Sequence, residues 1–327
     1  MTPLVEAVDI TKHYDARHGG MFRAPAPPLR AVDGVSLSIM EGETLGLVGE
    51  SGCGKSTLGR LLIRLLPVTG GTIRFAGTDI SGLEGKALRA VRRSMQIVFQ
   101  DPYGALNPRM TVEDIVMEPL VIHGAARDAA ARVAEMLSLV GLPARARDRF
   151  PHEFSGGQRQ RIGIARALVL RPKFVVCDEP VSALDVSVQA QIVNLLRDLQ
   201  GELGLTYLFI AHDLGVVKHI SDRVAVMYLG KVVEIAGKAS LYQAPRHPYT
   251  RGLIASVPVT HPAQRRRGAG ERHRLEGDIP SALNLPSGCR FHTRCPFVID
   301  LCRQQEPVMT GGADGHLVAC HRAQAIG

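Results

Sequence analysis

A glycine-rich octapeptide, Gly49-Glu50-Ser51-Gly52-Cys53-Gly54-Lys55-Ser56, lies between an apolar run over residues 44–48 and a helix-forming run over residues 57–62. Glycines at both ends followed by Lys-Ser fit the P-loop pattern, and a strand before the loop with a helix after it is the setting that this motif needs. Backbone N–H groups of such a turn bind phosphate oxygens at a helix N-terminus, where the helix dipole also favours an anion. The octapeptide therefore predicts a nucleoside triphosphate site within an α/β fold.

Six of the eight positions of this loop, and Thr57 after it, have an expected contact with the nucleotide or its metal ion. Lys55 is expected to reach the β- and γ-phosphates, and the hydroxyl of Ser56 is expected to bind Mg²⁺. The predicted nucleotide contacts are Gly49, Ser51, Gly52, Gly54, Lys55, Ser56 and Thr57.

Further motifs follow in a fixed order along the chain. Ser155-Gly156-Gly157-Gln158 opens a stretch of helix formers over residues 159–170, although alone it would pass for an ordinary capped turn. A buried-strand pattern over residues 174–177 runs into Asp178 and Glu179, and Asp185 follows. Two other apolar runs, over residues 97–99 and 207–211, end at Gln100 and His212 respectively.

This ordered set resembles the ATPase subunits of ATP-binding-cassette (ABC) transporters, and the resemblance covers residues 4–255. It implies that Asp178 holds Mg²⁺ through water and that Glu179 polarises the attacking water as general base. It implies that Gln100 touches both the metal and that water, and that His212 contacts the γ-phosphate. Tyr14 matches the aromatic residue that stacks on adenine. Catalysis of phosphoryl transfer is mostly positioning and electrostatics, which suits these residue types.

The same resemblance implies a dimer. In the family, the signature residues do not serve the nucleotide held by their own P-loop but complete the site of a second, facing cassette. The residues assigned to this shared site are Ser155, Gly156, Gly157, Gln158 and Asp185.

The composition agrees with a soluble enzyme, so any membrane role would require partner subunits. No apolar run approaches the ~18–20 residues of a membrane helix, and the N-terminus lacks the features of a signal peptide. We therefore expect the chain to stay in the cytosol, and the resemblance to ABC transporter ATPases implies a peripheral position at the cytoplasmic face of the cell membrane. The net charge of +8 comes mostly from scattered arginines. Their one cluster, Arg265–Arg267 with Arg272 and Arg274, is interpreted as a solvated linker, and no nucleic-acid partner is expected.

Strand and helix patterns alternate, which predicts a parallel α/β core. Strands over residues 4–14 and 31–48 surround an insertion at 15–29 that is interpreted as a mobile surface loop, and the resemblance implies an antiparallel β subdomain here. Residues Val133, Met136, Leu137 and Val140 fall on one helical face. We expect an ABC nucleotide-binding domain over 1–255, with a helical subdomain at about 101–160, and a small Cys-rich C-terminal domain over 256–327.

Two longer segments indicate which group of ABC transporter ATPases this sequence resembles. Residues 100–112 and His247–Leu253 look like the corresponding segments of oligopeptide and dipeptide importer ATPases. This implies an ATPase that powers peptide import, together with a related but distinct second ATPase, two transmembrane permeases and an extracytoplasmic binding protein. In such importers, the surface beside Gln100 receives a coupling helix of the permease.

Three alternatives to peptide import remain. Related importers carry nickel or another small solute with a similar ATPase. Soluble ABC ATPases of repair or translation usually have two cassettes or long insertions, which are not seen in this sequence. A module that binds ATP without turnover is disfavoured because Glu179, Gln100 and His212 are all present.

Four of the six cysteines lie in the last fifth of the chain: Cys289, Cys295, Cys302 and Cys320. Five, six and seventeen residues separate them, so the Cys-x-x-Cys pairs usual for structural zinc are missing. Widely spaced Cys₄ ligation suits an iron–sulfur cluster. The other two, Cys53 and Cys177, are interpreted as small packing residues.

Residues 288–297 resemble the C-terminal region of peptide-importer ATPases, some of which carry a [4Fe–4S] cluster there. The expected cofactors are ATP, Mg²⁺ and this cluster, whose role would be structural. Zinc, with His292 or His321 as an additional ligand, and the absence of any metal are the alternatives.

Overall fold

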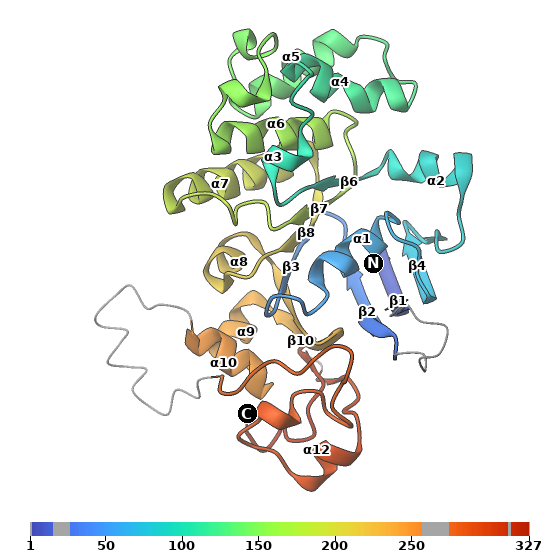
Figure 1. Cartoon of the computed structure of the whole chain (residues 1–327), viewed down its shortest axis with the longest axis vertical. Coiled ribbons are helices and arrows are strands. Elements are labelled where there is room, and N and C mark those ends of the chain that lie inside the picture. The colour runs from blue at the N-terminus through green and yellow to red at the C-terminus, as the bar shows by residue number, and fades with distance from the viewer. Residues whose placement is uncertain (1, 16–26, 257–274, 313–314, 327) are drawn as a thin grey trace, which may run out of the picture.

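The computed structural model describes residues 2–15, 27–256, 275–312 and 315–326. Most of the predicted loop at 15–29 and all of the arginine cluster at 265–274 lie outside these ranges. Figure 1 shows an elongated molecule, with helices at one end, two sheets in the middle and the C-terminal region at the other end.

The central sheet of the described residues has eight strands in the order β11-β12-β10-β9-β3-β8-β7-β6. Its strands are β3 (Thr44–Val48), β6 (Met95–Val98), β7 (Phe174–Asp178), β8 (Thr206–Ile210), β9 (Arg223–Tyr228), β10 (Lys231–Gly237), β11 (Thr310–Gly311) and β12 (Leu317–Val318). The five strands from β9 to β6 pair in parallel, and every residue of β3, β7 and β8 is buried. Near-continuous apolar runs are typical of strands that are covered on both faces. The predicted parallel core is confirmed.

A second, antiparallel sheet lies beside α1 (Lys55–Leu62), as Figure 1 shows. Its order is β2-β1-β4-β5, built from β1 (Val5–Tyr14), β2 (Leu29–Ile39), β4 (Gly70–Phe75) and β5 (Thr78–Asp79). The expected antiparallel subdomain is therefore present. The expected run at 31–48 is two strands of different sheets, β2 and β3, because the turn around Gly42 (φ 77°) separates them.

Most helices lie against the central sheet or form the upper end of the molecule in Figure 1, and the last one lies in the C-terminal region at the opposite end. They are α2 (Gly85–Arg92), α3 (Pro102–Ala105), α4 (Val112–Ile122), α5 (Ala129–Leu139), α6 (Gly156–Leu168), α7 (Val186–Leu203), α8 (Leu214–Ile220), α9 (Lys238–Gln243), α10 (Pro248–Ser256) and α12 (Asp300–Gln304). The predicted apolar face of α5 is buried at Val133, Met136 and Leu137, and Val140 just after the helix is buried too. No helix among the described ranges is long and apolar enough to cross a membrane.

The C-terminal region packs onto the cassette through the sheet. β12 pairs antiparallel with β10, with Glu234 opposite Val318 and Ile235 opposite Leu317. The strands β10, β12 and β11 thus add an antiparallel edge to the parallel core. β11 and β12 were not predicted, because two-residue strands carry no readable alternation.

Candidate functional site

Neighbouring parallel strands bring the predicted catalytic segments to one edge of the sheet. β6, β7, β8 and β3 are adjacent in that order, and their carboxyl ends precede Gln100, Glu179, His212 and the P-loop respectively. Ligands of open α/β sheets bind outside the carboxyl ends of the strands. The topology therefore assembles segments that lie far apart in the chain.

The phosphate-binding loop depends on glycine at two close backbone approaches. A Cβ at Gly49 (φ 153°) would lie 2.1 Å from the carbonyl oxygen of Met227, and a Cβ at Gly54 (φ 106°) would lie 2.1 Å from that of Ala31. Lys55, 4% exposed, donates from Nζ to the carbonyls of Gly49 (2.7 Å) and Glu50 (3.1 Å). The loop thus wraps around a buried ammonium at the start of α1.

The expected magnesium ligands lie side by side. The hydroxyl of Ser56 donates to Oδ1 of Asp178 over 2.6 Å, and Asp178 is 1% exposed. Hydroxyl and carboxylate oxygens are ligands that Mg²⁺ accepts in nucleotide sites, so this pair fits the cation in its donor chemistry. Arg60 of α1 lies 3.4 Å from Oδ2 of Asp178 and was not predicted.

Glu179 is held in an uncommon backbone conformation next to its predicted companions. Its φ is 48°, which is rare for a side chain of this size. Gln100 donates from Nε2 to its carboxylate over 2.9 Å, and Nδ1 of His212 lies 3.7 Å from the same oxygen. Such backbone strain is found at functional sites where the surroundings hold it in place.

A cavity of about 340 Å³ opens at this edge of the sheet. Tyr14 lines it at the end of β1, and the ammonium of Lys12 lies 5.1 Å from the Tyr14 ring centroid. The predicted site residues that line it are Tyr14, Ser51, Gly52, Gly54, Lys55, Ser56, Thr57, Gln100 and Glu179.

The predicted signature residues do not line this cavity. Ser155 caps α6 in a reciprocal arrangement with Gln158, and Asp185 caps α7 by accepting from the amide of Val188. The Asp185 carboxylate accepts hydrogen bonds that lower its pKa below the ordinary value, and the bond from the Ser187 hydroxyl has the largest effect. A Cβ on Gly157 would lie 2.5 Å from Val188. The starts of α6 and α7 are thus packed closely together, away from the P-loop of the same chain.

The four C-terminal cysteines line one small cavity of about 10 Å³, together with His247, His292 and His321. Burial raises the pKa of Cys289 to about 12 and that of Cys295 to about 11. In the ranges that the structure covers, no group of three or more His, Cys, Asp or Glu is arranged to hold a metal ion. The thiols fit a cluster in number and kind, but they would have to move apart to admit one. Cys53 and Cys177 are buried, as expected for packing residues.

One contact of the P-loop comes from a residue that sequence reasoning did not single out. Arg294, which immediately precedes Cys295, pairs with Glu50 through two hydrogen bonds of 2.8 and 3.0 Å. These residues are 244 positions apart, and neither belongs to a motif that would link them.

The similarity of this chain to known proteins covers nearly its full length. Residues 32–182 match the family described as "ABC transporter", and residues 233–302 match "Oligopeptide/dipeptide transporter, C-terminal region". The oligopeptide transport ATP-binding protein AppF of Bacillus subtilis is 54% identical over 97% of both chains. The chain belongs to the ABC transporter ATPases of the oligopeptide type. The oligopeptide transport ATP-binding protein OppF of Salmonella typhimurium is 51% identical over 99% of this chain and 97% of its own.

Solved structures agree on the fold of this ABC ATPase. The ATP-binding cassette MJ0796, in a dimeric post-hydrolysis state with ADP and Pi, is 30% identical with a TM-score of 0.63. The aligned region covers 72% of this chain and 98% of the MJ0796 chain. CbiO1 of Clostridium perfringens, part of the ABC transporter complex cbiONQ, is 27% identical with a TM-score of 0.64, over 75% of this chain and 92% of its own. The chain is thus an ATP-binding, ATP-hydrolysing cassette.

Proposed function

We propose that this ATPase powers the import of peptides across the cytoplasmic membrane through partner permease subunits. The observation that carries the proposal is identity above 50% over nearly the whole chain to oligopeptide transport ATP-binding proteins. The similarity is not confined to the cassette, since residues 233–302 match the C-terminal region of oligopeptide and dipeptide transporters.

In the proposed reaction, a water oxygen attacks the γ-phosphorus of ATP, the bond to the bridging oxygen of ADP breaks, and phosphate leaves. Glu179 accepts the proton of that water, and Gln100, which contacts Glu179, orients it. His212 and Lys55 stabilise charge on the γ-phosphoryl oxygens, and Tyr14 stacks on adenine. Mg²⁺, when bound through Ser56, Gln100 and Asp178, supplies charge neutralisation at the phosphates.

The active unit in this proposal contains two facing cassettes. Residues 155–158 and Asp185 then serve the nucleotide of the partner, which agrees with their absence from the lining of their own chain's cavity. The similar cassette MJ0796 is dimeric in its structure with ADP and Pi. The resemblance to peptide importers favours a distinct second ATPase as the partner.

The proposed permease contact lies beside the Gln100 loop. A groove of about 210 Å³ there is lined by Phe99, Pro119, Ile122 and His123. Phe99 and Ile122 are exposed, at 36% and 53%. A short amphipathic helix binds such a groove through its apolar face. Two permeases and an extracytoplasmic binding protein would complete the importer, with this chain peripheral at the cytoplasmic face.

We further propose two domains, over 1–255 and 256–327, and a [4Fe–4S] cluster held by Cys289, Cys295, Cys302 and Cys320. The shared cavity of the four thiols supports the ligand set. The cluster would order a region with little core of its own. Anaerobically purified chain should contain about four irons and four sulfides, which the Cys295→Ser variant should lose. Zinc alone, or no metal, would contradict the cluster without affecting the ATPase.

The proposed function is tested by Glu179→Gln in the membrane complex that co-purifies with this chain. The variant should bind ATP but neither hydrolyse it nor support peptide uptake into vesicles. Glu135→Gln is the matched control, because Glu135 lies on the surface and pairs with Arg171 away from the cavity. If the wild-type complex takes up nickel but not peptides, the proposed cargo is wrong, whereas the proposed ATPase role still holds.

A further inference from the structure

Glu50, the second residue of the P-loop, is held at three points. Its amide donates to the hydroxyl of Tyr249 over 2.8 Å, and its carbonyl accepts from Lys55. Its carboxylate accepts two hydrogen bonds from Arg294. Two of these three partners, Tyr249 and Arg294, belong to the part of the chain that follows β10.

The Arg294 pair differs from an ordinary surface ion pair. The Arg294 side chain is 5% exposed, and its Nε donates to the carbonyl of Glu276 over 3.2 Å. The guanidinium lies 5.9 Å from the ring centroid of Tyr228 and 6.0 Å from that of Phe291. A planar guanidinium in such a two-bond pair fixes orientation as well as charge.

Tyr249 is fixed equally firmly. It is fully buried in α10, and its ring packs 4.7 Å from Tyr228 and 5.4 Å from Phe291, measured between centroids. Phe291 lies two residues after Cys289, and Arg294 lies one residue before Cys295. A continuous set of packed side chains thus joins the four-cysteine cavity to the phosphate-binding loop.

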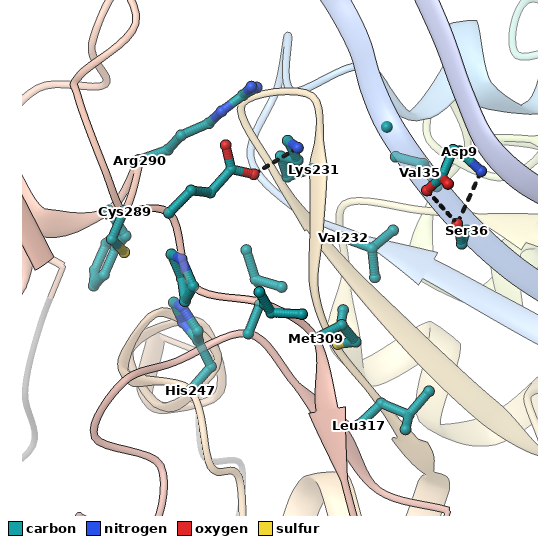
Figure 2. A pocket seen from close by; sticks show the side chains of 17 residues that line it. Asp9, Val35, Ser36, Lys231, Val232, His247, Cys289, Arg290, Met309 and Leu317 are labelled. Atoms are coloured by element: carbon teal, nitrogen blue, oxygen red, sulfur yellow. Dashed lines mark hydrogen bonds and ion pairs between the residues drawn. The ribbon is translucent and has the colours of Figure 1, made fainter. Parts of the chain in front are cut away.

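The C-terminal region makes further contacts with the cassette, one at the nucleotide cavity and others away from it. Ala282 lines the nucleotide cavity itself. Arg290 binds Asp33 and the carbonyl of Leu229. Lys231 and Glu306 form an ion pair of 2.5 Å at a separate cavity of about 450 Å³ between the two parts of the chain (Figure 2). This last pair docks the C-terminal region without touching the P-loop, so it provides a control.

We propose that Arg294 and Tyr249 are positioning residues for ATP, through which the C-terminal region completes the phosphate-binding loop. An acidic side chain in an anion-binding loop opposes phosphate binding unless its charge is compensated. Arg294 compensates the carboxylate of Glu50, and together with Tyr249 it holds the loop around Lys55. The four-cysteine region thereby acts on nucleotide affinity as well as on its own folding.

The test is the affinity of the full-length chain for MgADP, measured by calorimetry, which avoids turnover. Arg294→Gln should weaken binding about tenfold because the Glu50 carboxylate, which is only 21% exposed, loses its charged partner in an anion-binding loop. The Glu50→Gln/Arg294→Gln double variant should bind within about threefold of the wild type, since the unpaired charge is gone. Arg294→Lys should be intermediate, because it keeps the charge but not the two-bond geometry. Glu306→Gln, which removes the other ion pair, should leave the affinity unchanged.

Three results would overturn the proposal. The first is wild-type affinity in a folded Arg294→Gln variant. The second is an equal loss in Glu306→Gln, which would mean that any weakening of docking has the same effect. The third is a double variant as weak as the single one. If Arg294→Gln does not fold, Tyr249→Phe keeps the ring packing and removes only the hydroxyl. It should weaken MgADP binding about threefold, and an unchanged affinity would refute the proposal.

Discussion

Glu179 shows how a single residue depends on its surroundings. It follows the last residue of β7 with φ at 48°, and its amide donates to the carbonyl of Ile210 in the neighbouring strand β8. The sheet thus holds a conformation that the residue itself disfavours. Gln100, which follows β6 on the other side of β7, then donates a hydrogen bond to its carboxylate.

Gly157 provides a prediction at the residue scale. Gly157→Ala places a Cβ against Val188 and should displace the start of α6 from that of α7, at a cost of about 1–3 kcal/mol for overpacking. We expect ATP turnover of the assembled complex to fall about tenfold or more, with MgADP affinity of the isolated chain unchanged. Gly163→Ala is the control, because a Cβ there meets nothing within 4 Å and should stabilise α6 slightly. Equal turnover of both variants would contradict the prediction.

The C-terminal thiols provide a second prediction at the residue scale. In the metal-free chain Cys289 and Cys295 should be protonated at neutral pH, because burial raises their pKa values to about 12 and about 11 respectively. Since the thiolate is the nucleophile, alkylation by iodoacetamide should be slow at pH 7 and rise steadily toward pH 11. The urea-unfolded chain is the reference for each pH. Rapid alkylation of the folded chain at pH 7 would show that the thiols are not buried in this way.

At the element scale, the start of α10 contains a buried titratable group. His247 is 1% exposed, and its Nδ1 accepts from the amide of Tyr249 over 3.1 Å. Burial lowers the pKa of His247 to about 3. The neutral ring therefore holds the first turn of the helix that positions Tyr249.

This gives a pH dependence with a definite sign. From about pH 6.5 down to about pH 3 the unfolded chain binds a proton at His247 that the folded chain does not, so this group lowers stability as the pH falls. His247→Asn keeps an acceptor but removes the titration. Between pH 7 and pH 5 the wild type should lose about 2 kcal/mol more than the variant in urea unfolding. Identical losses would show that His247 is protonated in the folded chain.

Elements differed in how far the sequence predicted them. α5 and β7 were predicted because their apolar residues follow helical and buried-strand patterns over many positions. β11 and β12 were not, because each has two residues and forms only by pairing, β12 with β10 and β11 with β12. The break between β2 and β3 was missed because strand-forming residues lie on both sides of it, and a short turn at Gly42 separates the two strands.

At the scale of the whole molecule, the site residues that could be predicted from the sequence are those that follow the ends of β-strands. The P-loop, Gln100, Glu179 and His212 each follow a β-strand, so a parallel sheet brings them together whatever the loops between them contain. The pairing of Arg294 with Glu50 has no such rule, because it depends on how the C-terminal region docks onto the cassette. Sequence reasoning therefore identified the four cysteines as a group but not their connection to the ATP site.

The central claim is that ATP hydrolysis by this chain is coupled to peptide import. The most direct measurement is the ATPase rate of the co-purified membrane complex in proteoliposomes, with its binding protein either peptide-loaded or empty. We predict that loaded binding protein raises the rate severalfold in the wild type, and that Glu179→Gln shows no hydrolysis under either condition. A rate that does not respond to peptides but rises with nickel, or with nucleic acid in the absence of membranes, would contradict the account.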